Sequence, residues 1–201
     1  METKVCCVTG HRDIPTDRAV YVEQALRREV LAAIEDGYTR FISGFAEGTD
    51  LMFAAIVAEQ KEYSPNLYLE AALPYAGRIK TKSKQFHDLL RICDEVTVVC
   101  QEYTPSCFMQ RNRYMAAESQ RVIAVYDGRD RGGTLYTMRY AHTLEKEVRV
   151  IEIRTLCDLG DSNVASPTIL CPFYEITSPV FWFVDFSHSS ASPLFLTRFR
   201  R

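Results

Sequence analysis

The chain has 201 residues, of which 47% are hydrophobic and 25% are charged, so it can form one well-packed domain with an appendage and is not disordered in bulk. Its 24 Lys and Arg against 26 Asp and Glu give a net charge of -2, which excludes a global field that would attract nucleic acid or an anionic membrane. No stretch is apolar enough to span a bilayer, and the N-terminal sequence lacks the pattern of a secretory signal, so we expect no membrane contact.

The chain begins with a short apolar run, residues 4–8, which predicts a strand. Adjacent Cys6 and Cys7 lie within this run. The chain has seven cysteines, an odd number, which disfavours a disulfide framework. A reducing compartment fits this cysteine usage best, and we therefore expect a cytoplasmic protein.

Strand and helix patterns alternate from there to residue 153. Apolar residues four apart predict a helix over 22–34, and Gly37 ends it. Further strands are predicted at 41–43, 66–73, 95–100, 121–126 and 148–153, and further helices at 51–59, 82–92, 103–119 and 132–147. We therefore predict an α/β fold of the Rossmann-like, doubly wound type, with a mainly parallel sheet and helices on both faces.

The composition changes after Ile153. Residues 154–201 contain no Lys, and their aromatic residues group without helical periodicity. We divide the chain into a Rossmann-like domain, 1–153, and a C-terminal extension, 154–201. The extension is either an arm that docks on the sheet or on a partner, or a poorly ordered tail, and the second interpretation is favoured because termini are often loose.

A glycine-rich turn, residues 43–50, lies between the second predicted strand and the second predicted helix. Gly44 and Gly48 permit positive φ and close backbone approach, while Thr49 and Asp50 are placed to cap the helix. The first N–H groups of a helix bind anions, so we expect the phosphate of a nucleotide-like ligand here. The spacing matches neither the dinucleotide fingerprint nor the Walker pattern, and a plain packing turn is the alternative.

The loops after the other predicted strands carry further polar residues. Gly10 lets a ligand approach the backbone, and Arg12 is placed to bind a phosphate, with a surface cap as the alternative. His11 has no identified carboxylate partner, so we interpret it as structural. Gly133 and Thr134 repeat the glycine-turn pattern at another helix start.

Acidic and amide side chains complete the candidate site. Glu47 and Asp50 flank the first turn, where carboxylates cap amides or accept ribose hydroxyls, and Asp127 is a second candidate for the ribose. Arg111 and Asn112 lie early in the helix over 103–119, where one arginine should face the ligand. The predicted ligand-binding residues are Gly10, Arg12, Gly44, Glu47, Gly48, Thr49, Asp50, Arg111, Asn112, Asp127, Gly133 and Thr134.

These motifs resemble those of the SLOG superfamily of Rossmann-like proteins. Residues 43–50, Ser-Gly-Phe-Ala-Glu-Gly-Thr-Asp, are similar to the Ser-Gly-x-Ala-x-Gly-x-Asp motif of its DprA branch. Segments 9–12, 107–115 and 125–134 are closer still to its YpsA-like branch, and the resemblance covers about residues 4–153. It implies a nucleotide-type ligand, such as ADP-ribose or NAD, at the glycine turns, and a ligand sensor rather than an efficient enzyme.

Two other branches of the superfamily supply alternatives. The LOG branch hydrolyses nucleoside monophosphates at the N-glycosidic bond, but its glutamate after the Gly-Gly-x-Gly-Thr pattern has no counterpart in residues 131–137, so Glu47 or Asp50 would have to replace it. The DprA branch binds single-stranded DNA, which needs a basic groove with aromatic residues. Basic residues at 78–84, near Tyr75 and Phe86, form one candidate groove, although the net charge of the chain disfavours nucleic acid.

Other chemistry finds no support in the sequence. No cysteine or histidine spacing fits a metal site, so we predict neither a metal nor a resident cofactor beyond the nucleotide-type ligand. A homodimer is compatible with this architecture by analogy alone.

Overall fold

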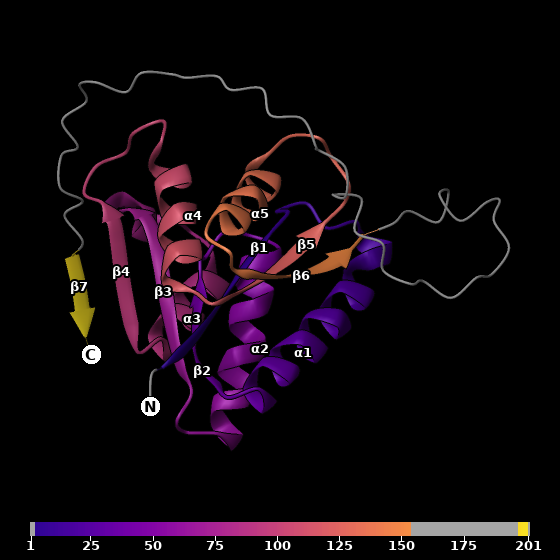
Figure 1. The fold of residues 1–201 in the computed structure, drawn as a ribbon. Coiled ribbons are helices and arrows are strands. Elements are labelled where there is room, and N and C mark those ends of the chain that lie inside the picture. The colour runs from indigo at the N-terminus through magenta and orange to yellow at the C-terminus, as the bar shows by residue number, and fades with distance from the viewer. Residues whose placement is uncertain (1–2, 154–196, 201) are drawn as a thin grey trace, which may run out of the picture. The chain divides into compact units, whose positions relative to one another are not determined.

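The computed structural model describes residues 3–153 and 197–200, which form a sheet covered by helices (Figure 1). The strands are β1 (Lys4–Gly10), β2 (Tyr38–Ser43), β3 (Tyr68–Tyr75), β4 (Glu95–Cys100), β5 (Arg121–Tyr126), β6 (Glu147–Glu152) and β7 (Thr197–Arg200). The α-helices are α1 (Ala19–Glu35), α2 (Thr49–Tyr63), α3 (Lys84–Ile92), α4 (Cys107–Glu118) and α5 (Gly133–Thr143). Two short 3-10 helices are η1 (Thr16–Arg18) and η2 (Ala76–Lys80).

The strands are ordered β6-β5-β1-β2-β3-β4-β7. Strands β1 to β6 pair in parallel, and β7 pairs with β4 in the antiparallel direction. The chain runs from β1 to β4 toward one edge, and then returns to place β5 and β6 on the other side of β1. The predicted Rossmann-like α/β fold is confirmed, and the strand order reverses between β1 and β5.

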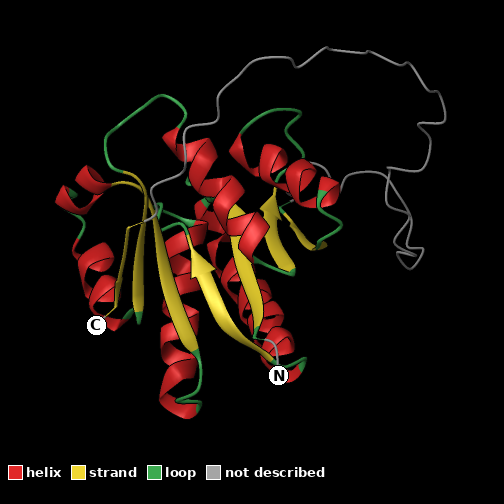
Figure 2. Ribbon diagram, turned by 60° about the vertical axis from the view of Figure 1, so that its left-hand side comes forward, coloured by secondary structure: helices red, strands yellow, loops and turns green. Residues whose placement is uncertain are grey.

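The helices cover both faces of the sheet (Figure 2). Helix α2 contacts α1 and α3 on one face, and α4 contacts α5 on the other. Alternate residues of β1 pack against the helices on opposite faces of the sheet, because successive side chains along a strand point to opposite faces. Cys6 and Val8 belong to the larger apolar cluster with α1, α2 and α3, whereas Val5 and Cys7 belong to the cluster with α4 and α5. Strand β1 is therefore buried on both sides, and its carboxyl end is held firmly.

The cysteines in the described part of the chain are free thiols. Cys6 and Cys7 are fully buried in β1. Burial raises the pKa of the Cys7 thiol to about 12, and the hydrogen bond with Ser119 lowers it in part. Burial also raises the pKa of the Cys6 thiol, so both thiols of β1 are protonated at neutral pH and act as small apolar core residues.

The predicted boundaries differ from the structure in several places. The strand predicted at 41–43 begins at Tyr38, and the helix predicted over 132–147 ends at Thr143. The predicted C-terminal extension lies outside the described residues apart from β7, which forms a strand beside β4. Within residues 3–153 and 197–200, no helix is long and apolar enough to cross a membrane.

Candidate functional site

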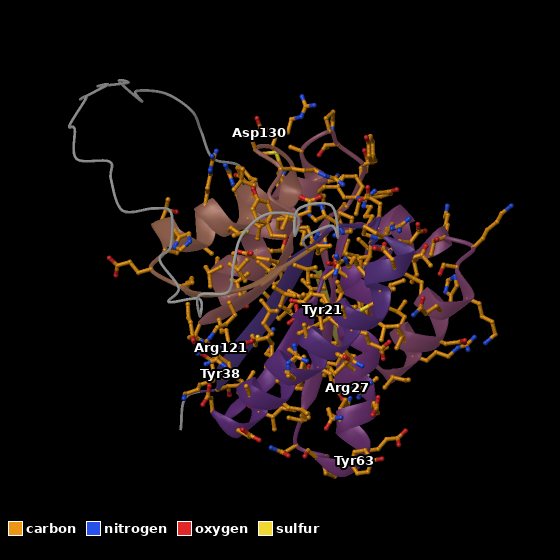
Figure 3. All side chains as sticks on the ribbon, turned by 90° about the vertical axis from the view of Figure 1, so that its right-hand side faces the viewer. Tyr21, Arg27, Tyr38, Tyr63, Arg121 and Asp130 are labelled. Carbon is orange, nitrogen blue, oxygen red and sulfur yellow. The ribbon has the colours of Figure 1, made fainter. Side chains whose placement is uncertain are left out.

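A pocket of about 340 Å³ opens at the carboxyl ends of β1 and β5. This is the point where the strand order reverses, and ligands of open parallel sheets bind at such points. The loop between β5 and α5 forms part of its rim, and Figure 3 shows Asp130 of this loop at the opposite end of the sheet from Tyr38 and Arg121, the first residues of β2 and β5. The pocket is lined by Val8, Thr9, Gly10, His11, Arg12, Asp13, Ala46, Asp50, Phe108, Arg111, Asn112, Arg129, Arg131, Gly132, Gly133 and Thr134.

Residues 11–13, which we call the strap, cross the pocket directly after β1. The start of α2 holds the strap from below, because the backbone N–H and the Oγ1 hydroxyl of Thr49 both donate to the His11 carbonyl oxygen, at 3.2 and 3.0 Å. Gly48 lies against the strap backbone with φ +76°, and a Cβ atom at this position would lie 2.4 Å from the Arg12 carbonyl oxygen. A Cβ at Gly10 would lie 2.4 Å from Thr49 Oγ1. Glycine is required at both positions to bring strap and helix together.

The strap side chains reach two sides of the pocket, because His11 and Asp13 contact the segment after β5 and Arg12 contacts α4. His11 Nε2 lies 2.9 Å from Asp127 Oδ1, at ion-pair distance, although without the alignment of a hydrogen bond. The Arg12 guanidinium lies 5.3 Å from the centre of the Phe108 ring, a cation–π contact with α4.

Asp13, the last strap residue, accepts a hydrogen bond of 3.3 Å from Arg129 Nη2. Its own backbone N–H and then Arg129 lower the pKa of the Asp13 carboxyl below the ordinary value. The carboxylate is therefore ionised at neutral pH. Arg129 also contacts Asp127 at 2.6 Å, so this arginine joins the strap to the end of β5.

A buried ion pair forms the floor of the pocket. Arg111 Nη1 donates to Asp50 Oδ2 at 2.9 Å, and each side chain is only 7% exposed. Asp50 Oδ2 also accepts from the Ala46 backbone N–H at 3.3 Å. Gly44 makes room for the arginine, because a Cβ at this position would lie 1.2 Å from Arg111 Nη1. Arg111 Nε is a buried donor that has no acceptor among the described residues.

The start of α5 supplies the opposite wall. Gly132 is its N-cap residue, with φ +117° and no side-chain cap, and Thr134 is buried beside Gly133. Asn112 Nδ2 would lie 3.5 Å from a Cβ at Gly133, so α4 and α5 approach closely here. The first N–H groups of a helix have no partner within it, and they form an anion site where they face a pocket.

Seven of the twelve sequence-predicted residues line this pocket: Gly10, Arg12, Asp50, Arg111, Asn112, Gly133 and Thr134. The other five lie outside its lining. Gly44, Gly48 and Thr49 pack behind it, Asp127 contacts His11, and Glu47 is exposed. The prediction that Thr49 and Asp50 cap α2 was wrong, because the helix has Gly48 as N-cap and no side-chain cap.

Several pocket residues did not stand out in the sequence. No carboxylate partner for His11 could be identified in the sequence, and the structure provides Asp127, which follows β5 and is distant along the chain. Asp13, Arg129 and Arg131 lie in loops directly after β1 and β5, a position that would have been sufficient to select them. Phe108 lies in segment 107–115, which carries the family resemblance, but it was not selected as a site residue, since single aromatic residues near helix starts are common.

Comparisons with known proteins agree with this fold. The YpsA family model, described as the YspA SLOG family, matches residues 6–156. A UPF0398 protein of Halalkalibacterium halodurans is 24% identical over 144 residues, covering 69% of this chain and 74% of the relative. An uncharacterized SPbeta prophage-derived protein, YoqJ, of Bacillus subtilis is 30% identical over 137 residues, covering 58% of this chain and 80% of the relative. A UPF0398 protein of Bacillus licheniformis is 25% identical over 185 residues, covering 86% of this chain and 99% of the relative.

A solved structure shares the fold. DNA processing protein A from Helicobacter pylori, described for its single-stranded DNA binding mode, superimposes with a TM-score of 0.53 at 18% sequence identity. The match covers 73% of this chain and 64% of that protein, slightly less than two thirds of its length. At this level of identity the likeness concerns the fold alone.

Proposed function

The chain belongs to the YpsA family of SLOG proteins, and on this premise we propose that its pocket binds a nucleotide or a nucleotide-derived ligand, such as ADP-ribose or NAD, and acts as a ligand sensor. The observation that carries the proposal is the charge of the pocket, whose charged lining residues are four arginines and two aspartates. This positive lining surrounds a helix N-terminus at the point where the strand order reverses. We further propose that residues 1–153 form the binding domain and that it works in the cytoplasm, which suits its free buried thiols.

The start of α5 and the turn before α2 are the two candidate sites for the phosphate of the ligand. The backbone at Gly133 and Thr134 offers N–H donors to a phosphate, and exposed Arg131 adds a positive charge beside them. The turn before α2 is less suited to this role than the sequence suggested, because the Thr49 N–H already donates to the His11 carbonyl oxygen. We therefore assign the phosphate to the start of α5.

Replacing Arg131 with Ala is expected to weaken binding of a phosphate-bearing ligand about 10- to 100-fold, the usual effect of one charge-assisted hydrogen bond. The full chain would first be heated with AMP, ADP, ADP-ribose, NAD and a short single-stranded DNA, since a specific ligand raises the melting temperature. The affinity of each compound that stabilises it would then be measured by calorimetry for the wild type and for Arg131→Ala.

Arg139→Ala is the matched control, because Arg139 is an exposed arginine of α5 that does not line the pocket. It should bind as the wild type does. Equal losses in the two variants, or a panel without any stabilising compound, would overturn the proposed site.

The pocket supports binding without turnover. Asp50, one of the two carboxylates weighed as a replacement for the LOG glutamate, is held by Arg111 and by the Ala46 N–H, and Glu47 lies outside the lining. We expect that a bound nucleotide incubated with the protein releases no free base beyond the rate without protein, as measured by chromatography. Release that is lost in an Asp50→Asn variant shown to be folded by circular dichroism would replace the sensor with an N-glycosidase.

Single-stranded DNA is the second candidate ligand. The fold likeness to a protein that binds single-stranded DNA weakens the expectation that nucleic acid is not a partner. Exposed Lys80, Lys82 and Lys84 lie at and after η2, which follows the carboxyl end of β3, and they would supply the basic residues that this ligand needs. Stabilisation by the oligonucleotide and by none of the mononucleotides would favour this candidate.

A further inference from the structure

Three aromatic side chains form a cluster at the rim of the pocket. The Phe108 ring, in the first turn of α4, meets the Tyr75 ring at 85° with centroids 6.3 Å apart. The Tyr75 ring, at the end of β3, meets that of Tyr103 at 82° and 5.3 Å. Gly77 makes room for this arrangement, because a Cβ there would lie 3.1 Å from Tyr75 Cε2. Such edge-to-face contacts fix the orientation of Phe108 without occupying both of its faces.

Phe108 lines the pocket and shares one face of α4 with the residues of its floor and far wall. Positions 108, 111 and 112 lie three and four residues apart, so their side chains point to the same side of the helix. Asn112 approaches Gly133 at the start of α5, where the phosphate is assigned. Along the axis of α4, Phe108 is therefore about one helical turn, about 5.4 Å, from Asn112, which borders the phosphate end of the pocket. A ribose can span this interval.

Arg12 covers the side of the Phe108 ring that faces the strap, with its guanidinium 5.3 Å from the ring centre. Arg12 is exposed, whereas Phe108 is half-buried and supported by the two tyrosines. A flat guanidinium can stack on the ring of a nucleotide base as it does on the phenyl ring of Phe108. The arginine can therefore move outward and stack on a ring that enters between it and Phe108.

From this arrangement we propose that Phe108 and Arg12 form the subsite for the aromatic base of the ligand, with the base stacked between the phenyl ring and the guanidinium. The proposal rests on the proposed nucleotide-binding function and adds the residues that select a base-bearing ligand over a sugar phosphate. Tyr75 and Tyr103 are positioning residues, since they act through Phe108. Arg12, which the sequence assigned to the phosphate, is assigned to the base instead.

The test compares AMP with ribose 5-phosphate, which lacks the base, by calorimetry on the full chain. Phe108→Leu keeps an apolar side chain but removes the ring. It should weaken AMP binding about 5- to 100-fold, the usual effect of losing one stacked aromatic partner, and leave ribose 5-phosphate binding unchanged. Phe108→Tyr should retain the affinity for AMP. Arg12→Lys keeps the charge but loses the flat group, so it should weaken AMP binding and not ribose 5-phosphate binding.

Tyr63→Leu is the matched control, because Tyr63 is 75% exposed at the end of α2 and Figure 3 shows it far from Asp130. Its affinities should equal those of the wild type. If Phe108→Leu weakens both compounds equally while its melting temperature is unchanged, the base subsite is wrong although the pocket binds. If Phe108→Leu is poorly folded, Arg12→Lys tests the base subsite in its place. Equal losses of affinity for AMP and ribose 5-phosphate in Arg12→Lys would contradict the subsite and indicate that Arg12 binds the phosphate. A wild type that binds neither compound, nor any nucleotide of the panel, would instead overturn the proposed function.

Discussion

Replacing Asp50 with Asn should destabilise the protein by about 3–5 kcal/mol, the usual cost of removing one partner from a buried ion pair. The substitution preserves size and still offers an oxygen to Arg111, but it removes the negative charge that compensates a guanidinium with a side chain only 7% exposed. Arg111 cannot move away, because it fills the space beside Gly44. The free energy of unfolding would be measured by urea titration at neutral pH and low salt.

Asp88→Asn provides the comparison for Asp50→Asn. Asp88 pairs with Lys84 and Arg91 on the surface of α3, with exposed fractions of 41%, 89% and 72%, and exposed pairs contribute about 0–1 kcal/mol. Combining Asp50→Leu with Arg111→Met should recover part of the loss, because no unpaired charge is then buried. Similar losses for Asp50→Asn and Asp88→Asn would mean that the pocket floor is hydrated and that the pair does not act as a buried one.

Gly48→Ala is the second substitution with a large expected effect, about 2–5 kcal/mol in the free energy of unfolding. The residue has φ +76°, which an L side chain rarely adopts, and its Cβ would lie 2.4 and 2.7 Å from the carbonyl oxygens of Arg12 and His11. Both contacts involve backbone atoms, so rotation of a side chain cannot relieve them. The strap has to shift, and we expect ligand affinity to fall together with stability.

The contribution of crowding can be separated from that of the dihedral angle. Gly37 has φ +84° in the turn between α1 and β2, and a Cβ at this position would meet nothing within 4 Å. Gly37→Ala should therefore lower the free energy of unfolding only through the strain of a positive φ, by about 1–2 kcal/mol, and leave ligand binding unchanged. If Gly48→Ala lowers the free energy of unfolding no more than Gly37→Ala does, the strap can shift at no measurable cost and the crowding argument is wrong.

The pattern of apolar residues was sufficient to predict the strand–helix order and the parallel sheet, because the buried strands are short apolar runs and the helices bury one stripe. The ends of the helices and strands were harder to predict. The predicted helix over 132–147 ends early because Glu145 has φ +53°, a conformation for which glycine or asparagine is the usual signal. Strand β2 was predicted too short because Arg40 is polar, and its salt bridge with fully buried Glu70 in β3 can be seen only in three dimensions.

The candidate site was predictable where its residues follow a strand directly and not where its shape depends on distant segments. The position of Gly10 and Arg12 at and after the end of β1, and of Gly133 and Thr134 in the first turn of α5, follows from the parallel topology. The function of Thr49 does not, because its hydroxyl donates to a carbonyl group 38 residues earlier in the chain. A glycine turn before a helix is compatible with phosphate binding and with close packing, and only the neighbouring backbone distinguishes the two.

The contact between Gly10 and Thr49 constrains how the protein can change during evolution. A Cβ at residue 10 would lie between 2.4 and 2.6 Å from three atoms of the Thr49 side chain, so each position limits the volume available to the other. A lineage that gains a side chain at residue 10 has to lose one at residue 49, and neither intermediate packs well. Substitutions at these two positions should therefore be correlated among homologues, and single replacements should be purged even where no ligand is bound.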